Sequence, residues 1–161
     1  MPVEQVRQFL QANNIKYVTV SHSTAYTAQE IAALTHMKGR DLAKTVVVKV
    51  DGSLALAVVP ASSSVDLLRV REISGGRSVE LASEGEFRTR FSGCELGAMP
   101  PFGNLYEIPV YVDATLASKH EIAFNAGTHS ELMQLAYADF ERLVKPQVGA
   151  ITPMRKGAHA A

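Results

Sequence analysis

The fold of this chain is decided by residues 43–60, which read AKTVVVKVDGSLALAVVP. Two nearly continuous apolar runs, residues 43–50 and 53–60, are separated only by Asp51-Gly52, a dipeptide that favours a tight turn between paired strands. Because successive residues of both runs are apolar, we expect a hairpin in the middle of a sheet whose two faces are both covered.

Helices and strands are both predicted on either side of this hairpin, from the period of the apolar residues and from capping and turn signals. The expected helices cover residues 2–14, a short segment opened by the capping box of Thr27 and Glu30, and residues 65–73, 83–90, 114–118 and 138–144. The other expected strands cover residues 15–20, 78–82, 106–112, 121–125 and 131–136. Hairpins outnumber strand–helix–strand units, so the sequence predicts an α/β fold with a mixed, partly antiparallel sheet covered by helices.

Composition and charge limit the class of protein. The chain has 161 residues, of which 47% are hydrophobic and 20% charged, and this mix is typical of one globular domain. We expect that domain over residues 1–150, followed by a flexible C-terminal tail over residues 151–161. Sixteen Lys plus Arg balance sixteen Asp plus Glu, so overall charge does not hold the protein to nucleic acid or membrane. With neither a membrane-length apolar run nor a signal peptide in the sequence, we expect a cytoplasmic monomer.

Several common kinds of reactive site have no motif here. The histidines show no metal-binding spacing, and they are His22, His36, His120, His129 and His159. The Gly-rich stretch near residue 100 lacks the Lys-Ser/Thr of a phosphate-binding loop. Cys94, the single cysteine, is either a thiol nucleophile, which would need a base within reach, or an inert apolar residue.

Two features remain as candidates for chemistry. Lys44 opens the apolar run of residues 44–48, so its ammonium either extends to water at the strand end or meets an anion such as a phosphate. Residues 97–103, GAMPPFG, form a stretch stiffened by Pro in which Gly lets a ligand approach the main chain. This stretch is either a plain connection or a site that orients a water or an amino group through backbone groups.

A third stretch, residues 125–129 (NAGTH), follows a predicted strand. We expect a positive φ at Gly127, and His129 is either a structural residue or one that faces the same end of the sheet as Lys44.

In this order, three motifs resemble the YbaK/prolyl-tRNA-synthetase editing-domain family of single-domain, trans-acting aminoacyl-tRNA deacylases. They are Lys44-Thr45-Val46-Val47-Val48, the Gly97 to Pro101 G-x-x-x-P loop, and residues 121–127 (EIAFNAG). The likeness extends from His22 to Phe140, nearly the whole chain. One departure is Thr45, because some editing branches carry Asn after the lysine.

The resemblance implies a mixed-sheet α/β fold and hydrolysis of the ester that joins a wrongly attached small amino acid to tRNA. It implies that the reaction uses no metal and no organic cofactor. The partners it implies are the mischarged tRNA, bound through its 3′ CCA end, and an aminoacyl-tRNA synthetase. The catalytic residues carried over are Lys44, which holds the tRNA end, and Gly97 and Pro101 of the loop that positions water. The substrate contacts carried over are His22, Thr45, Met99, Phe102, Gly103, Asn125, Gly127 and His129.

Two questions stay open from the sequence. Alanine, serine, threonine and cysteine all remain candidates for the edited amino acid, because pocket volume decides among them. The alternative function is a non-catalytic module that uses the same pocket to hold a tRNA end or a synthetase.

Overall fold

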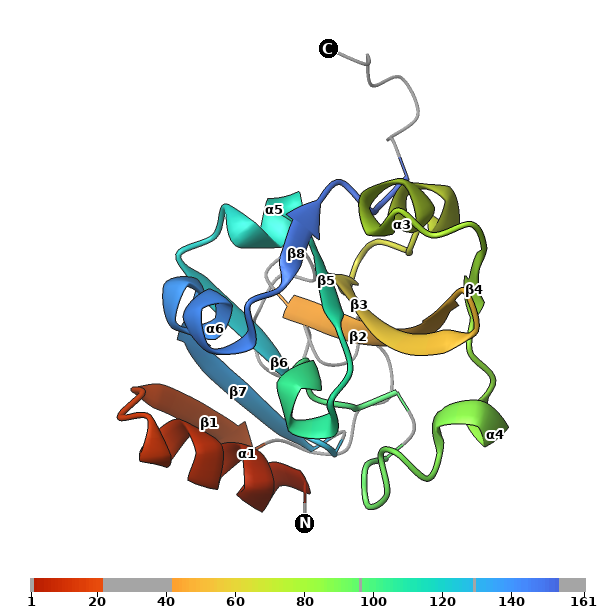
Figure 1. Cartoon of the computed structure of the whole chain (residues 1–161). Coiled ribbons are helices and arrows are strands. Elements are labelled where there is room, and N and C mark those ends of the chain that lie inside the picture. Colours follow the sequence, from red (N-terminus) through yellow and green to blue (C-terminus); the bar gives the residue numbers. More distant parts are fainter. Residues whose placement is uncertain (1, 22–41, 96, 129, 154–161) are drawn as a thin grey trace.

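The computed structural model describes residues 2–21, 42–95, 97–128 and 130–153, and in these ranges the chain forms a mixed eight-stranded sheet with helices packed against it (Figure 1). The strands are β1 (Tyr17–Ser21), β2 (Leu42–Val50), β3 (Ser53–Pro60), β4 (Val79–Leu81), β5 (Val110–Asp113), β6 (Glu121–Asn125), β7 (Glu131–Ala136) and β8 (Gln147–Gly149). The helices are α1 (Pro2–Ala12), α3 (Leu67–Ser74), α4 (Glu84–Phe87), α5 (Ala114–Ala117) and α6 (Tyr137–Val144), with a 3-10 turn, η2 (Gly103–Tyr106). No described helix is long and apolar enough to cross a membrane.

The strand order β1-β7-β6-β2-β3-β5-β8 confirms the predicted fold class and places the β2–β3 hairpin at the centre of the sheet. Strands β2 and β3 are antiparallel, whereas β2 with β6, β3 with β5 and β5 with β8 are parallel. The turn residues Asp51 and Gly52 have φ of 50° and 85°, and positive values at both positions are what a tight two-residue hairpin turn requires.

One edge of β2 is continuous and the other is divided. On one side β3 pairs with β2 from Ala43 to Val50. On the other side β6 pairs only with Leu42 and Ala43, and β4 pairs only with the last three residues of β2. Within the described residues, positions 44–47 therefore have no paired strand on that side, and Val47 O accepts from Ala82 N just beyond β4, which leaves positions 44–46. We call this stretch, residues 44–46, the split edge.

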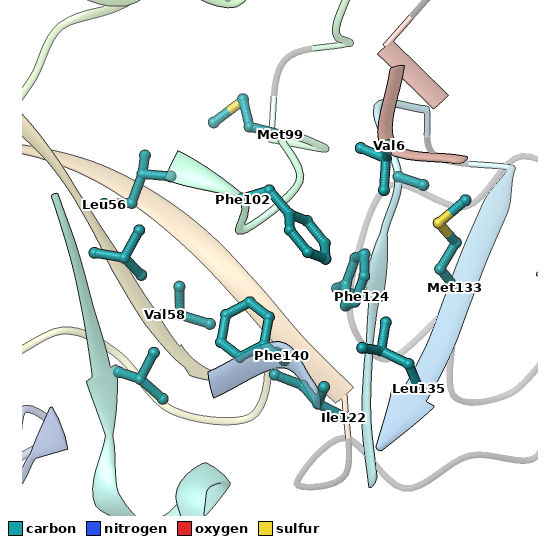
Figure 2. Close-up of a cluster of buried hydrophobic side chains, with 14 of the residues drawn as sticks. Val6, Leu56, Val58, Met99, Phe102, Ile122, Phe124, Met133, Leu135 and Phe140 are labelled. Carbon is teal, nitrogen blue, oxygen red and sulfur yellow. The ribbon is translucent and has the colours of Figure 1, made fainter. Parts of the chain in front are cut away.

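Both faces of the sheet are covered, as the apolar runs predicted. A first core joins β3, β6 and β7 to α1, α6 and the loop before η2, and Figure 2 shows part of it. A second core on the other face packs Val70 of α3 against β2, β3 and β5. On β3, Leu56 and Val58 face the first core and Val59 faces the second, as expected from side chains that alternate along a strand.

The chain contacts the second core just after the boundary expected at residue 150. Ile151 is fully buried in the second core, its N–H donates to Asp113 Oδ1 at 2.9 Å, and its carbonyl accepts from Asp66 N at 2.7 Å. An aliphatic side chain in the core keeps this part of the chain ordered, so the folded unit includes Ile151. Residues 154–161 lie outside the described residues.

Three other expectations differ from the structure. Strand β8 was not predicted, and α4 ends at Phe87 instead of continuing to residue 90. The strand expected over residues 106–112 begins only at Val110, because η2, a left-handed Glu107 (φ 57°) and Pro109 precede it. The helix predicted from Thr27 and Glu30 lies outside the described residues.

Candidate functional site

Lys44 and Asn125 lie on the second face of the sheet, just beyond the last pair that joins β2 to β6. Ala43 pairs with Phe124 across β2 and β6, and both side chains belong to the first core. One residue further along each strand, Lys44 and Asn125 therefore point to the opposite face. On its other side Lys44 pairs with Val59 and Asn125 pairs with Leu132, and both of these partners are almost completely buried. Each of the two polar side chains thus lies next to an aliphatic one, on the same face of neighbouring strands.

The ammonium group of Lys44 is half-buried, and no carboxylate among the described residues pairs with it. Burial lowers its pKa from the usual 10.5, because a charged ammonium loses hydration there. Lys49, on the same strand, is different: it pairs with Glu80 at 3.0 Å and with Glu86. Of these two lysines, Lys44 is the one available to bind an oxygen of a ligand.

Asn125 carries an unused hydrogen-bond acceptor. The residue is only partly buried, but its Oδ1 atom is buried and has no hydrogen-bond partner. A buried polar atom without a partner destabilises the free protein, so such atoms are uncommon outside functional sites. Asn125 lies on the same face of the sheet as Lys44, on the neighbouring strand, and its paired residue on β7 is the aliphatic Leu132.

The Gly/Pro loop, residues 97–103, is tied to the turn that follows β6. Glu95 N donates to Gly127 O and Gly127 N donates to Ala98 O, both at 2.8 Å. Gly97 and Gly127 have φ of 83° and 105°, which confirms the positive φ expected at Gly127. Gly127 lies two residues after the end of β6, so the loop is attached to the turn that follows the strand paired with the start of β2.

The side chains of the loop anchor it in the first core. Phe102 is fully buried, and its ring centroid lies 5.4 Å from that of Phe124 and 5.5 Å from that of Phe140; Figure 2 shows the ring directed toward both. Met99 is also buried in the first core, and Pro101 is buried while Gly97 is exposed. The side chains of the loop are therefore used for packing, and Gly97 is its exposed end.

The structure does not bring every predicted site residue to the same face. Thr45 is 7% exposed and pairs with Val58, which belongs to the first core, so its side chain points away from the face of Lys44. Gly103 is buried behind the loop, against Ile108 O. His22 and His129 lie outside the described residues.

Cys94 lies near the loop but not in a reactive environment. Burial raises the pKa of its thiol, and its Sγ is 3.9 Å from the Tyr106 hydroxyl. Cys94 and Met99 line a cavity of about 210 Å³ together with four residues of the α4 region, which the sequence did not indicate because the cavity forms only when α4 folds beside the loop. In the ranges that the structure describes, no cluster of three or more His, Cys, Asp or Glu could hold a metal ion.

Comparison with known proteins decides the family. The aminoacyl-tRNA editing domain matches residues 22–143, a range that holds Lys44, the Gly/Pro loop and Asn125. This chain belongs to the aminoacyl-tRNA editing domain family. The predicted resemblance is confirmed, and with it the expectation of a hydrolase that acts on the ester of aminoacyl-tRNA.

Two curated relatives are similar in sequence. Over 124 residues the chain is 33% identical to the multifunctional Ser/Thr-tRNA deacylase ProXp-y of Escherichia coli, covering 72% of this chain and 74% of that protein. Over 90 residues it is 30% identical to a proline–tRNA ligase of Bacillus mycoides, covering 56% of this chain and only 16% of the ligase.

A solved structure has the same fold. The crystal structure of a candidate trans-editing enzyme for prolyl-tRNA synthetase superposes with a TM-score of 0.80 at 24% identity, over 95% of this chain and 98% of that one. This likeness shows the fold alone.

Proposed function

We propose that the protein is a trans-acting deacylase that removes a small amino acid, serine or threonine first, from the 3′ end of mischarged tRNA. The observation that carries the proposal is the half-buried Lys44, which has no carboxylate partner among the described residues and lies at the split edge, on the same face of the sheet as Asn125. The proposed choice of amino acid is supported by the name of the Escherichia coli relative, a Ser/Thr-tRNA deacylase.

In this proposal Lys44 holds the 3′-terminal nucleotide of the CCA end through a phosphate or ribose oxygen. The ammonium has lost part of its hydration in the free protein, as its lowered pKa reflects. An anionic or oxygen-rich ligand replaces that lost hydration, so binding is favoured at this position over an exposed lysine. The field of one cation also orients the ester relative to the loop.

The Gly/Pro loop positions the reacting groups through its main chain. A water oxygen attacks the ester carbonyl carbon, the bond from that carbon to the ribose oxygen breaks, and the ribose oxygen takes up a proton. Backbone groups between Gly97 and Pro101 orient the water and the acyl group, and the neighbouring ribose hydroxyl of the tRNA assists. Because an ester is more reactive than an amide, such positioning supplies much of the rate without a covalent intermediate.

The remaining predicted contacts belong to the same proposal. His22, Asn125, Gly127 and His129 contact the aminoacyl end directly. The buried residues Met99, Phe102 and Gly103, with Thr45 on the opposite face of β2, act from behind by fixing the shape of the loop and strand. The protein works as a cytoplasmic monomer on free mischarged tRNA, with a synthetase as a further partner.

A panel of tRNAs mischarged with alanine, serine, threonine or cysteine tests this function. We expect the ester to be lost fastest from the seryl and threonyl members, and the Lys44→Met variant to lower kcat/KM by roughly ten- to hundredfold, the loss of one charge-assisted hydrogen bond. Lys49→Met is the matched control, because this lysine lies on the same strand but is already paired with Glu80 and Glu86.

Each failure has a distinct meaning. Ester loss at the spontaneous rate across the whole panel contradicts the deacylase function. Tight tRNA binding without turnover selects the non-catalytic module instead. Equal activity of Lys44→Met and the unmodified protein removes Lys44 from the mechanism but leaves the deacylase function in place.

A further inference from the structure

We infer that Asn125 is the hydrogen-bond partner of a substrate hydroxyl group, either the side-chain hydroxyl of the amino acid or that of the terminal ribose. The inference rests on the proposed function and adds to it the group that the site recognises. It is carried by the buried, unpartnered Oδ1 atom and by the place of Asn125 in the sheet.

The surroundings of Asn125 leave its amide available. Across β7 it faces Leu132, which is 1% exposed and offers no polar atom from its side chain. Toward β2, the residue one step beyond the last paired position is Lys44, which has donors only and does not hydrogen-bond the Asn125 oxygen. The acceptor oxygen is thus buried without a partner in the free protein, and a hydrogen-bond donor on a ligand would give it one.

The chemistry of the pair favours a hydroxyl over the other groups of an aminoacyl-tRNA end. An α-ammonium group could donate to Asn125, but the partly buried Lys44 ammonium, on the same face of the neighbouring strand, would repel it. A phosphate has acceptors only, and Lys44 serves it better than a neutral amide does. A hydroxyl both donates and accepts, as does an amide, and it carries no charge to be repelled.

Recognition by a buried amide has a consequence for specificity. A substrate that lacks the hydroxyl leaves the amide unpaired, so the site rejects it more strongly than a volume filter alone would. One such hydrogen bond corresponds to about a tenfold difference in affinity.

The experiment measures binding with four non-hydrolysable analogues of the tRNA end. These are 3′-seryl and 3′-alanyl amides of 3′-amino-3′-deoxyadenosine, each made with and without the ribose 2′-hydroxyl. Affinities are measured for the unmodified protein, for Asn125→Leu, and for Asn125→Ala as a second variant that adds no volume. Gln134→Leu is the matched control, because it removes an amide from β7 at the level of Ala123, on the same face.

We expect the unmodified protein and Gln134→Leu to prefer one hydroxyl-bearing analogue about tenfold, and both Asn125 variants to lose that preference. If the Asn125 variants lose only the preference for seryl over alanyl analogues, Asn125 binds the hydroxyl of the amino acid. If they lose only the preference for analogues with the ribose 2′-hydroxyl, Asn125 binds the terminal nucleotide. The inference is overturned if the unmodified protein shows neither preference, if both preferences survive in the Asn125 variants, or if those variants weaken all four analogues equally. Turnover of seryl-tRNA by the unmodified protein is measured separately, so the proposed function can hold while this inference fails.

Discussion

Lys44 and Lys49 show how one strand can place two identical side chains in opposite electrostatic states. Lys49 bridges Glu80 of β4 and Glu86 of α4, and this contact lowers the pKa of Glu86 to about 2. Lys44 has no such partner among the described residues, and burial lowers its own pKa. Lys49 fastens β4 and α4 to β2, whereas Lys44 is without a carboxylate partner in the described part of the chain.

Replacing Lys44 by Met is expected to maintain or raise stability while activity falls. The folded-state pKa of Lys44 is lowered, so the charged group is penalised on folding at all pH values below that pKa, and the penalty disappears as pH rises toward 10.5. Met removes the penalty and keeps the apolar stem. Denaturant midpoints at pH 7 check this, and a fall in the midpoint would mean that Lys44 stabilises the free protein.

The pH dependence of kcat/KM should follow the same group. If the protonated ammonium binds the tRNA end, kcat/KM falls as pH rises through the pKa of Lys44 in the free enzyme, which lies below 10.5. Rates are corrected for spontaneous ester loss at each pH. In Lys44→Met this alkaline decline should be absent; its persistence would assign the titration to another group.

Cys94→Ser is expected to change kcat/KM by no more than about twofold. The thiol has a raised pKa, so it is protonated at neutral pH and a poor nucleophile, and its polar neighbour is the Tyr106 hydroxyl. Steady-state rates on seryl-tRNA check this. Complete loss of activity in a folded variant would instead make the protein a thiol hydrolase.

At the scale of elements, the Gly/Pro loop is held from two sides. In front, Glu95 and Ala98 exchange backbone hydrogen bonds with Gly127. Behind, Phe102 fills the space between Phe9, Phe124 and Phe140. A loop fixed in this way can present main-chain groups in one arrangement before substrate arrives, which is what positioning catalysis requires.

Gly103→Ala tests that rigidity. A Cβ at Gly103 would overlap Ile108 O and the Val110 side chain, so the end of the loop must shift. We expect a loss of about 1–3 kcal/mol in stability, as in other overpacked sites, together with a lower kcat. Gly85→Ala is the matched control, because nothing lies within 4 Å of its added Cβ and an alanine suits a helix. Unchanged melting and activity in Gly103→Ala would show that the loop is adaptable.

The sequence predicted the elements best where local signals were strong. Asp51-Gly52 located the hairpin, and alternating apolar residues gave β6 and β7 with the bounds that the structure has. Strand β8 was missed because its three residues pair only with β5, far away in the chain. The neighbourhood of Lys44 and Asn125 was also hidden, because it depends on a two-residue parallel contact between β2 and β6 that no local pattern marks.

At the scale of the molecule, the end of the chain is part of the fold. Buried Asp113 accepts hydrogen bonds from Thr115 N, Ile151 N and Thr152 Oγ1, and so joins α5 to the segment after β8. Ile151 in turn fills the second core beneath α3. These contacts hold the segment after β8 against the end of the sheet opposite β1.

Truncation distinguishes the fold from the tail. Deleting residues 154–161 is expected to leave the melting temperature unchanged, because their sequence is small and polar. Deleting residues 151–161 removes a buried isoleucine and leaves an α-carboxylate near Asp113, so stability should fall by roughly 2–5 kcal/mol, the range for truncating a buried Ile. Ile151→Ala in the full chain measures the contribution of this side chain independently. Equal melting temperatures for all variants would mean that the folded domain ends at residue 150.

The divided edge of β2 has a consequence for how this enzyme can diversify. Lys44 lies on a strand that pairs with β3 along nearly its whole length, while the Gly/Pro loop is attached elsewhere, to the turn after β6. If both have the roles proposed for them, binding of the nucleic acid and choice of the amino acid depend on separate parts of the fold. Substitutions near that turn are then expected to change which amino acid is removed while the contact to the nucleotide is kept.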